Sequence, residues 1–555
     1  MNSKTRIGLE ILEAALLLGL LGDVLLRATP WGLNVLLWVG GLVSVMITLT
    51  LRRKREIWTK QTIALHGALM FFAAGFVWRD SFALQTLDVL AMLVLLAILS
   101  LPALKISPQI AGFLHYALGA VSSGFNAAFA PFLLIFGDIE WKTIPRSGWT
   151  KHGLAIIRGL AIAAPILLVF GVLFMAADAV FEGIVKNTFN IQPEILFSHV
   201  LLFSFFAWIC AGYLRGALFG GVLNDNWTTD FSANKSAVLE THQSAASITD
   251  NLTEKEIKEL PRTEAKPKEE KKDFIDYLPD FVRLGAIETG VVLGLINLLF
   301  LGFVIVQLRY FFGGMDFVQT TENFKLAEYA RRGFFELCWV AALVLPILLT
   351  THFLLHKNNL LTEKLFRTLS AVNIGLLFII MYSAVNRMLL YTGNLGYGMT
   401  TMRLYPTAFM FWLALVFVWF GLTVLRGQAK HFAWGALWMA LFVVAGLHVL
   451  NPDNFIVRHN VILMEQGRSF DVVYNARYLS DDAIPVLADA LPQMTFEQQC
   501  VVKDEFWHRW ENKQDRDFRT WNLSRWQSRN ILTQLNGSFD NSACPPQSQR
   551  NNDDF

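Results

Sequence analysis

The sequence predicts an all-α fold: a polytopic integral membrane helical bundle of about 11–13 transmembrane segments, followed by a small soluble helical tail. Composition supports this class, because apolar residues make up 54% of the chain and charged residues only 17%. Soluble domains contain about 25% charged residues. The mean hydropathy is +0.42. Apolar runs close to the roughly 20 residues that span a bilayer core as a helix recur along the chain.

The N-terminal membrane half, residues 1–221, contains the first predicted spans. These cover residues 7–26, 31–51, 62–78, 82–101, 154–177 and 195–219. The first run carries Glu10, Glu13 and Asp23 and lacks a small-residue cleavage site, which favours a retained span over a signal peptide. The short basic loop at residues 52–60 lies in the cytoplasm by the positive-inside rule.

Residues 108–136 allow two interpretations. The segment is apolar but interrupted by small and polar residues, among them Gly119, Asn126 and Pro131. A single crossing puts the basic residues between 142 and 158 outside, whereas a re-entrant or broken hairpin puts them in the cytoplasm. We expect the hairpin, because it agrees with the positive-inside rule.

The second half of the chain begins after a change of composition. Residues 222–283 are rich in Asn, Ser, Thr, Glu and Lys without apolar periodicity, which predicts a disordered charged linker. The C-terminal membrane half is residues 284–450, and the soluble helical tail is residues 451–555. Counting spans from the basic loop places the N-terminus in the cytoplasm and the tail outside it. In the tail, Thr495 begins a capping-box pattern, TFEQ.

Five stretches of the second half resemble one membrane-protein family. They read QLRYFFGG, AEYARRGFFEL, RMLLYTGNLGYGMTTMRLY, NPDNFIVRHN and YLSDDAIPVL. Together they resemble the bacterial family catalogued as domain of unknown function 4173. The resemblance implies a protein of the bacterial cytoplasmic membrane with no assigned activity, and it supplies no catalytic residues.

Ionisable residues inside spans are candidates for function, because a charge at the bilayer centre costs about 2.5–3.5 kcal/mol on insertion scales. Glu13 and Asp88 lie deepest and are candidates for a polar pathway. Glu10, Asp23 and Glu288 lie nearer the span ends, where we expect them at headgroup depth.

No catalytic or metal-binding motif emerges. The four cysteines lack metal-ligand spacing. His352 and His356 share a helical face but have no third ligand nearby, so we expect them at the membrane surface. The chain has no GxSxG, P-loop or GxGxxG pattern, and we expect neither a cofactor nor a metal. A net charge of +2 gives no indication of nucleic-acid binding.

The most specific candidate site is an arginine-rich cluster in the loops of the second half. Its members are Arg309, Arg331, Arg332, Glu336, Arg387, Tyr391 and Arg403. Arginines at a membrane surface bind anionic headgroups or phosphates through bidentate hydrogen bonds. Interfacial anchoring with Arg–Glu pairing is the alternative.

Two classes of function follow. The first is a non-enzymatic sensor, scaffold or envelope-associated protein, embedded in the lipid bilayer, that binds a protein partner through its tail. The second is a transporter or membrane enzyme that handles a lipid-linked or anionic substrate at the arginine cluster. The lack of a catalytic motif favours the first.

Overall fold

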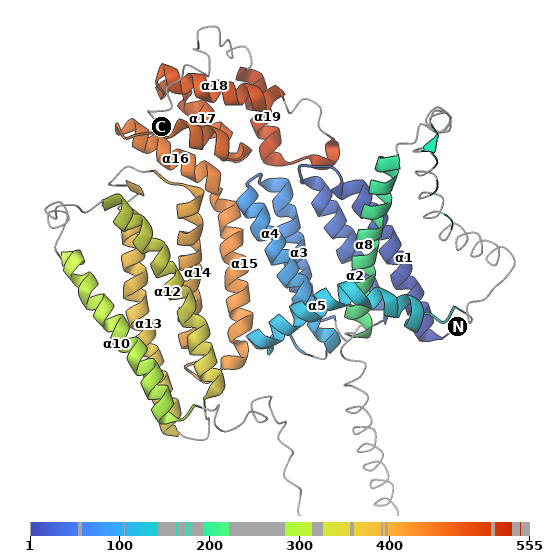
Figure 1. Cartoon of the computed structure of the whole chain (residues 1–555), viewed down its shortest axis with the longest axis horizontal. Coiled ribbons are helices and arrows are strands. Elements are labelled where there is room, and N and C mark those ends of the chain that lie inside the picture. The colour runs from blue at the N-terminus through green and yellow to red at the C-terminus, as the bar shows by residue number, and fades with distance from the viewer. Residues whose placement is uncertain are drawn as a thin grey trace, which may run out of the picture. The chain divides into compact units, whose positions relative to one another are not determined.

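A computed structural model shows a helical membrane protein (Figure 1). It describes residues 2–53, 58–104, 106–141, 163, 170, 174, 177–178, 193–220, 284–312, 326–355, 360–389, 392–393, 398–511, 517–535 and 544. Ten helices in these ranges are long and apolar enough to cross a membrane, and no strand occurs there. The prediction of an all-α multi-pass bundle is confirmed. The predicted span at 154–177 and the predicted linker at 222–283 lie outside the described ranges, apart from isolated positions.

The chain divides into two compact units. Unit 1 comprises Met1–Trp78, Thr86–Asp230 and Arg516–Leu523, and unit 2 comprises Arg79–Gln85, Phe231–Asp515 and Ser524–Phe555. The sequence contributes to both units from both of its halves. Each unit is described separately below.

Unit 1 is built from six described helices. They are α1 (Ser3–Leu26), α2 (Leu33–Arg53), α3 (Lys60–Trp78), α4 (Phe82–Leu99, whose first turn belongs to unit 2), α5 (Phe113–Leu133) and α8 (Pro193–Phe219). α1 and α8 pack closely through small residues, because a Cβ atom on Gly19 would lie 2.7 Å from the Cβ atom of Ala207. Small residues let membrane helices approach closely.

The expected hairpin at residues 108–136 is wrong. The segment is the continuous helix α5, extended by a π-helical turn, η3 (Leu134–Asp138). Its small and polar residues are contact surfaces: the Ser123 hydroxyl lies 2.7 Å from that of Ser100, and Asn126 packs against Gly216 of α8. A Cβ atom on Gly216 would lie 2.9 Å from that of Asn126. The same residue types that break a helix in isolation here permit two helices to cross, as Figure 1 shows for α5 and α8.

Both ends of α5 nevertheless lie at the same end of unit 1. Near its start, Tyr116 donates a hydrogen bond to the Pro108 carbonyl, a few residues beyond α4. Beyond its other end, the Glu140 amide donates to the hydroxyl of Thr5, at the beginning of α1. The beginning of α1 and the end of α4 lie at the same end of the bundle, so the topology expected from a hairpin arises from one tilted helix.

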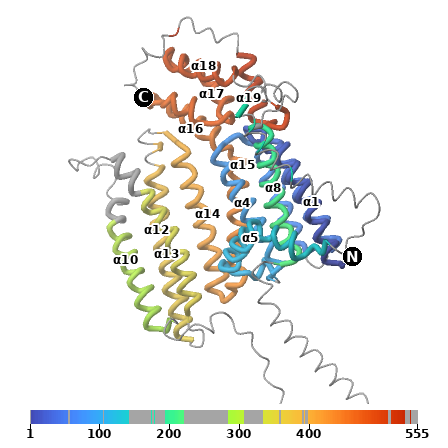
Figure 2. Tube along the Cα trace, turned by 45° about the vertical axis from the view of Figure 1, so that its right-hand side comes forward, coloured from blue at the N-terminus to red at the C-terminus, as the bar shows by residue number. Residues whose placement is uncertain are grey.

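Unit 2 contains five long helices and the tail. The helices are α10 (Ala286–Phe312), α12 (Leu326–Leu354), α13 (Leu360–Leu389), α14 (Thr401–Thr423) and α15 (Phe432–Leu450). Leu377 of α13 and Phe417 of α14 are fully buried in their shared core. Asn373 of α13 donates to Asn297 of α10 at 2.8 Å, so neutral amides join two spans. Figure 2 shows the helices running side by side.

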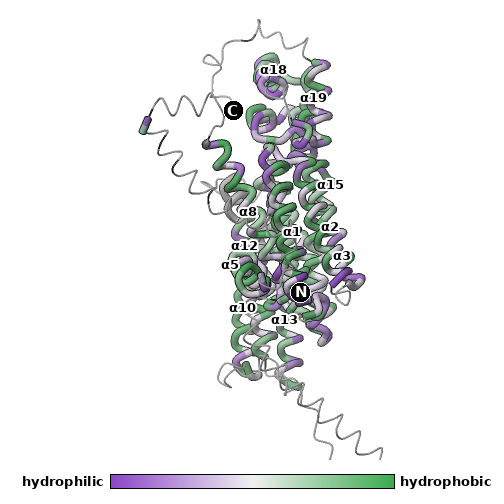
Figure 3. Tube along the Cα trace, turned by 90° about the vertical axis from the view of Figure 1, so that its right-hand side faces the viewer, coloured by the Kyte–Doolittle hydropathy of each residue, from purple (hydrophilic) through white to green (hydrophobic). Residues whose placement is uncertain are grey.

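The tail of unit 2 is a small helical domain of its own. Its helices are α16 (Pro452–Glu465), α17 (Ile484–Ala490), α18 (Phe496–Glu511) and α19 (Leu523–Leu535). Ile456, Phe506 and Leu532 belong to its buried core, and its helices are more hydrophilic than the spans (Figure 3). The predicted capping box is confirmed: the Gln498 amide N–H donates to the Thr495 hydroxyl, and the Thr495 amide N–H donates to the Gln498 side chain.

Candidate functional site

The predicted arginine cluster is only partly described. The side chains of Arg309, Arg331, Arg332 and Tyr391 lie outside the described residues. Of the other three members, Glu336 is exposed on α12, Arg387 is half-buried in α13, and Arg403 donates a hydrogen bond to the Gly398 carbonyl. Arg403 therefore holds the chain before α14, and convergence of the whole cluster on an anion stays a prediction.

The intramembrane candidates do not form one site. Glu13 lies on an exposed face of α1, whereas Asp88 of α4 is wholly buried. Glu10 forms an ion pair with Arg53, and Asp23 binds Arg27 and His199. The acidic residues of α1 thus belong to ion pairs or to the outer surface of the bundle.

The two predicted surface histidines are not brought together as a site. His352 packs its ring 5.6 Å from the ring of Phe366. His356 lies outside the described residues. Within the described part of the chain, no group of three or more His, Cys, Asp or Glu side chains is placed to hold a metal ion.

The structure assembles a buried polar site that the sequence did not predict, in unit 2. We call it the tail cluster; its members are Arg79, Asp80, Asp453, Ser480, Asp482 and Arg525. Asp482 is central: it pairs with Arg79 at 3.3 Å and accepts a hydrogen bond from the Asp80 amide at 2.9 Å. The Asp80 carboxylate lies 3.4 Å from Arg525. The cluster connects the turn between α3 and α4 to the tail domain.

Local sequence places each of these side chains. Asn451 adopts a left-handed conformation, φ 56°, and Pro452 at the first turn of α16 directs the chain away from α15. Ser480 caps a short 3₁₀ turn by accepting a hydrogen bond from the Asp482 amide at 3.3 Å. Arg79 also donates to the carbonyl of His448 at 2.9 Å, near the end of α15.

Two carboxylates of the cluster influence each other. Asp453 is 3% exposed; its Oδ2 atom accepts a hydrogen bond from the Ser480 amide at 3.1 Å, while no described group bonds its Oδ1 atom. Burial raises the pKa of Asp482, and the like charge of Asp453 raises it further. The Asp80 amide and Arg79 oppose this, but the net pKa stays above the ordinary value of 3.8. Asp482 is therefore the group of the tail cluster that takes up a proton most readily on acidification.

A neighbouring arginine fixes the adjoining backbone. Arg509 of α18 pairs with Asp481 at 3.2 Å and donates to the carbonyls of Ala476 and Leu479 at 2.7 and 2.9 Å. One guanidinium thus satisfies several acceptors where the backbone leaves regular helix geometry. It holds the Ser480–Asp482 segment in position beneath α18.

Three stretches quoted for the family resemblance meet around Asn460. Its side chain accepts a hydrogen bond from the Met399 amide at 2.6 Å and donates to the Met399 carbonyl at 3.0 Å. It also donates to Asn475 at 2.9 Å. Gly398 has φ +68°, and a Cβ atom there would lie 2.7 Å from the Asn460 oxygen, so glycine is required on both counts. The polar motif residues therefore hold the tail domain against the beginning of α14.

The chemistry of the tail cluster is that of a charge-compensated joint. It opposes three carboxylates with two guanidinium groups, and most of these side chains are buried. Short runs such as NPD and SDD, with helix-capping residues beside acidic ones, are the only signal that the sequence offered for it. The partners Arg79 and Arg525 carry no such signal.

Comparisons with known proteins add a family. A family model described as "Domain of unknown function (DUF4153)" matches residues 66–490. The expected number, 4173, is wrong, although the expectation of a family of unknown function is correct. The comparisons with curated proteins and with solved structures find no match to the chain. The matched range contains all members of the tail cluster except Arg525.

Proposed function

The chain belongs to the family described as a domain of unknown function (DUF4153), and on that premise we propose that it works by binding, as a sensor or scaffold of the bacterial cell envelope. The observation that carries the proposal is the tail cluster. It joins a packed soluble domain to a turn between two spans through buried charges. A partner that moves the tail would act directly on that turn.

Buried charges suit such a joint because they are specific in position. Breaking a buried ion pair typically costs about 3–5 kcal/mol, since the remaining charge is left uncompensated. Asp482 has its carboxylate held by Arg79, the Asp80 amide and Ser480 in one arrangement. The tail and the turn are then expected to move together, as a sensor or a scaffold requires.

Contacts within unit 1 support a tail on the side opposite the basic loop. The segment Arg516–Leu523 binds the ends of α1, α2 and α3: the Leu33 amide donates to the Trp521 carbonyl at 2.9 Å, and Asn522 donates to the Phe76 carbonyl at 2.7 Å. Arg53, which precedes the rest of the basic loop, lies at the other end of α2. With that loop in the cytoplasm, the N-terminus is cytoplasmic and the tail extracytoplasmic.

A disulfide supports the same orientation independently. Cys500 of α18 is bonded to Cys544, whereas the other two cysteines, Cys210 and Cys338, are free and buried. Disulfides persist in oxidising compartments such as the bacterial periplasm or the cell surface and are rare in the cytoplasm. The pairing therefore favours an extracytoplasmic tail.

Exposed aromatic side chains on the tail provide a surface for a protein partner. Tyr478 is 73%, Phe496 57% and Trp526 50% exposed. Aromatic residues are enriched where proteins bind one another, because they bury a large area with few rotatable bonds. We expect these three residues to contribute most of the binding energy of the partner.

The test uses whatever phenotype follows deletion of the gene. Phe496→Ala and Trp526→Ala, at normal abundance, are expected to abolish rescue of that phenotype. The matched control is Leu298→Ala, a similar loss of exposed apolar surface on the span α10. Full rescue by both tail variants would refute a function that depends on the tail and would favour transport through the spans.

Orientation is tested separately with an impermeant thiol reagent on intact cells. A cysteine at Phe496 is expected to react, whereas a cysteine at Arg52 reacts only after permeabilisation. Both positions are exposed, and the native cysteines are disulfide-bonded or buried. The opposite pattern would refute the orientation.

A further inference from the structure

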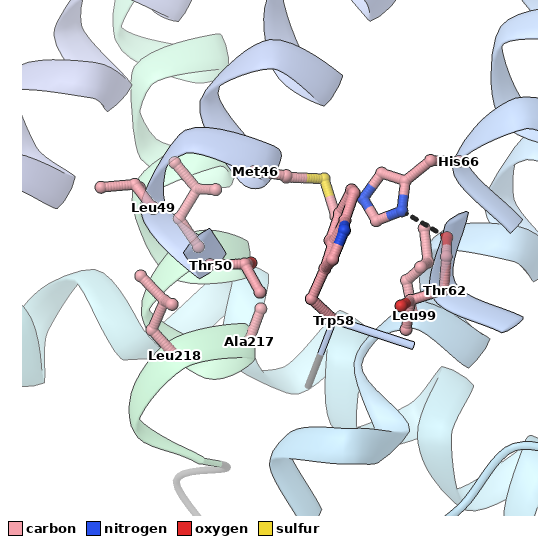
Figure 4. A pocket seen from close by; sticks show the side chains of 10 residues that line it. Met46, Leu49, Thr50, Trp58, Thr62, His66, Leu99, Ala217 and Leu218 are labelled. Atoms are coloured by element: carbon pink, nitrogen blue, oxygen red, sulfur yellow. Dashed lines mark hydrogen bonds between the residues drawn. The ribbon is translucent and has the colours of Figure 1, made fainter. Parts of the chain in front are cut away.

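Unit 1 contains a small cavity that has no place in the proposed function. Its volume is about 30 Å³, and it lies between α2, α3, α4 and α8 (Figure 4). Its walls are mostly apolar, with Met46, Leu49 and Leu218 among them, and Trp58 and His66 lie together on one side. A space of this volume admits one or two groups the size of a water molecule.

His66 presents an unused hydrogen-bonding atom to this cavity. The side chain is 92% buried, and its Nδ1 atom lies 2.6 Å from the Thr62 carbonyl oxygen. A carbonyl only accepts, so Nδ1 carries the proton and Nε2 of the neutral ring is an acceptor. No described group bonds Nε2, which points toward Trp58 and Met46 in Figure 4. A buried acceptor of this kind calls for a donor from a ligand.

The cavity lies at the level where lipid headgroups meet acyl chains. Thr50 is three residues before the end of α2, Thr62 is two residues after the start of α3, and Leu99 ends α4. Arg52 and Lys60 are exposed, and each lies two residues from a residue that lines the cavity. An occupant therefore meets apolar walls, one neutral acceptor and two nearby positive charges.

We propose that this cavity binds the headgroup of a phospholipid that carries a free hydroxyl beside its phosphate, as glycerol and inositol headgroups do. The hydroxyl donates to Nε2 of His66, and the phosphate lies toward Arg52 and Lys60, whose charges complement it. A choline headgroup has no hydrogen-bond donor and leaves the histidine unsatisfied. The apolar walls accommodate the carbon skeleton of the headgroup.

The experiment measures lipid retention by native mass spectrometry of the full chain, purified from vesicles of equal parts phosphatidylglycerol and phosphatidylcholine. The wild type is expected to retain phosphatidylglycerol preferentially. His66→Phe keeps a ring of similar size but removes the acceptor, and the preference is expected to fall about 5- to 10-fold, as for loss of one hydrogen bond. Ala217→Phe, which fills the cavity, has the same expected effect; Ala217 is one of its lining residues.

Two further variants separate binding from folding. His431→Phe makes the same chemical change at an exposed position of unit 2 and is expected to leave retention unchanged. Arg52→Gln alters only an exposed side chain and is expected to weaken retention of phosphatidylglycerol. If the two cavity variants fail to fold, the wild-type preference and Arg52→Gln decide the outcome.

Three results would overturn the proposal. Equal retention of the two lipids by the wild type is the first. Normal preference in folded His66→Phe and Ala217→Phe is the second. The third is displacement of the bound lipid by millimolar soluble glycerol phosphate, which would identify a soluble phosphate ester as the occupant instead of a lipid.

Discussion

The two units treat buried polar groups in the spans differently. In unit 1, Asp138 and Arg215 form an ion pair at 2.6 Å with both side chains 3% exposed, and Lys4 reaches the same carboxylate at 2.9 Å. Asp23, near the other end of α1, binds Arg27 and His199. In unit 2, the described contact between α10 and α13 depends on neutral amides, Asn297 and Asn373.

The difference indicates how each unit fixes its helices. Ion pairs near both ends of α1 set its register against α8 in unit 1. In unit 2, packing and amide hydrogen bonds hold the spans, while buried charges gather where the tail meets the α3–α4 turn. Charge substitutions should therefore be most harmful in the membrane part of unit 1, and substitutions in the tail should leave the spans of unit 2 intact.

The largest expected effect comes from Arg215→Met. It leaves Asp138 buried beside a single, half-exposed partner, Lys4, and breaking a buried pair typically costs about 3–5 kcal/mol of folding free energy. Denaturation of the purified protein with sodium dodecyl sulfate measures the loss. Adding Asp138→Leu should restore most of the stability. A cost below 1 kcal/mol would contradict a register set by charge.

Cys500→Ser is expected to cost the tail about 2–4 kcal/mol, because the disulfide closes a long loop in the unfolded chain. Its partner Cys544 is 44 residues away. The rate of proteolysis of the tail measures the loss, with unfolding of the spans followed in parallel. Cys338→Ala, at a buried free cysteine of α12, is the matched control and should leave the tail unchanged. Equal destabilisation of tail and spans would show that they unfold as one cooperative unit.

Asn297→Leu is expected to cost only about 0.6–1.7 kcal/mol, the range measured for interhelical hydrogen bonds in a membrane protein. The substitution removes the hydrogen bond to Leu369 and the acceptor for Asn373. The same detergent titration as for Arg215→Met gives a direct comparison. A larger loss than for Arg215→Met would reverse the contrast between the units.

Asp482→Asn should show the smallest effect, and its sign depends on pH. Since burial raises the pKa of Asp482 above 3.8, protonation favours the folded tail, and the wild type loses this contribution as pH rises from 3.8 through the raised pKa. The stability of Asp482→Asn relative to the wild type should therefore increase with pH over that window. Proteolysis of the tail at graded pH measures it, and a difference that shrinks as pH rises would contradict the raised pKa.

The spans themselves follow from sequence because they depend on local composition. A helix must satisfy its own backbone inside a bilayer, so apolar runs of sufficient length become helices whatever surrounds them. The run predicted at residues 31–51 is α2 (Leu33–Arg53), and the run predicted at 82–101 is α4 (Phe82–Leu99). The capping box at Thr495 is local in the same way and was likewise predictable.

Contacts between distant segments could not be predicted in this manner. Four cysteines allow three pairings, and sequence alone does not choose among them. α5 illustrates a subtler limit: Gly119 and Asn126 read as breaks until α8 and the end of α4 are in place to pack against them. Whether a small residue interrupts a helix or lets another helix approach depends on its neighbours in space.

The sequence by itself determined that the chain is an all-α membrane protein with a soluble tail, because length and apolarity of each segment suffice for that. Only the tertiary structure decided where its buried polar groups meet. Arg79 and Asp482 are 403 positions apart and join through the fold of unit 2, and His66 becomes a cavity wall only when four helices surround it. Charge and hydrogen-bond partners are chosen by proximity in space, which no periodicity along the chain records.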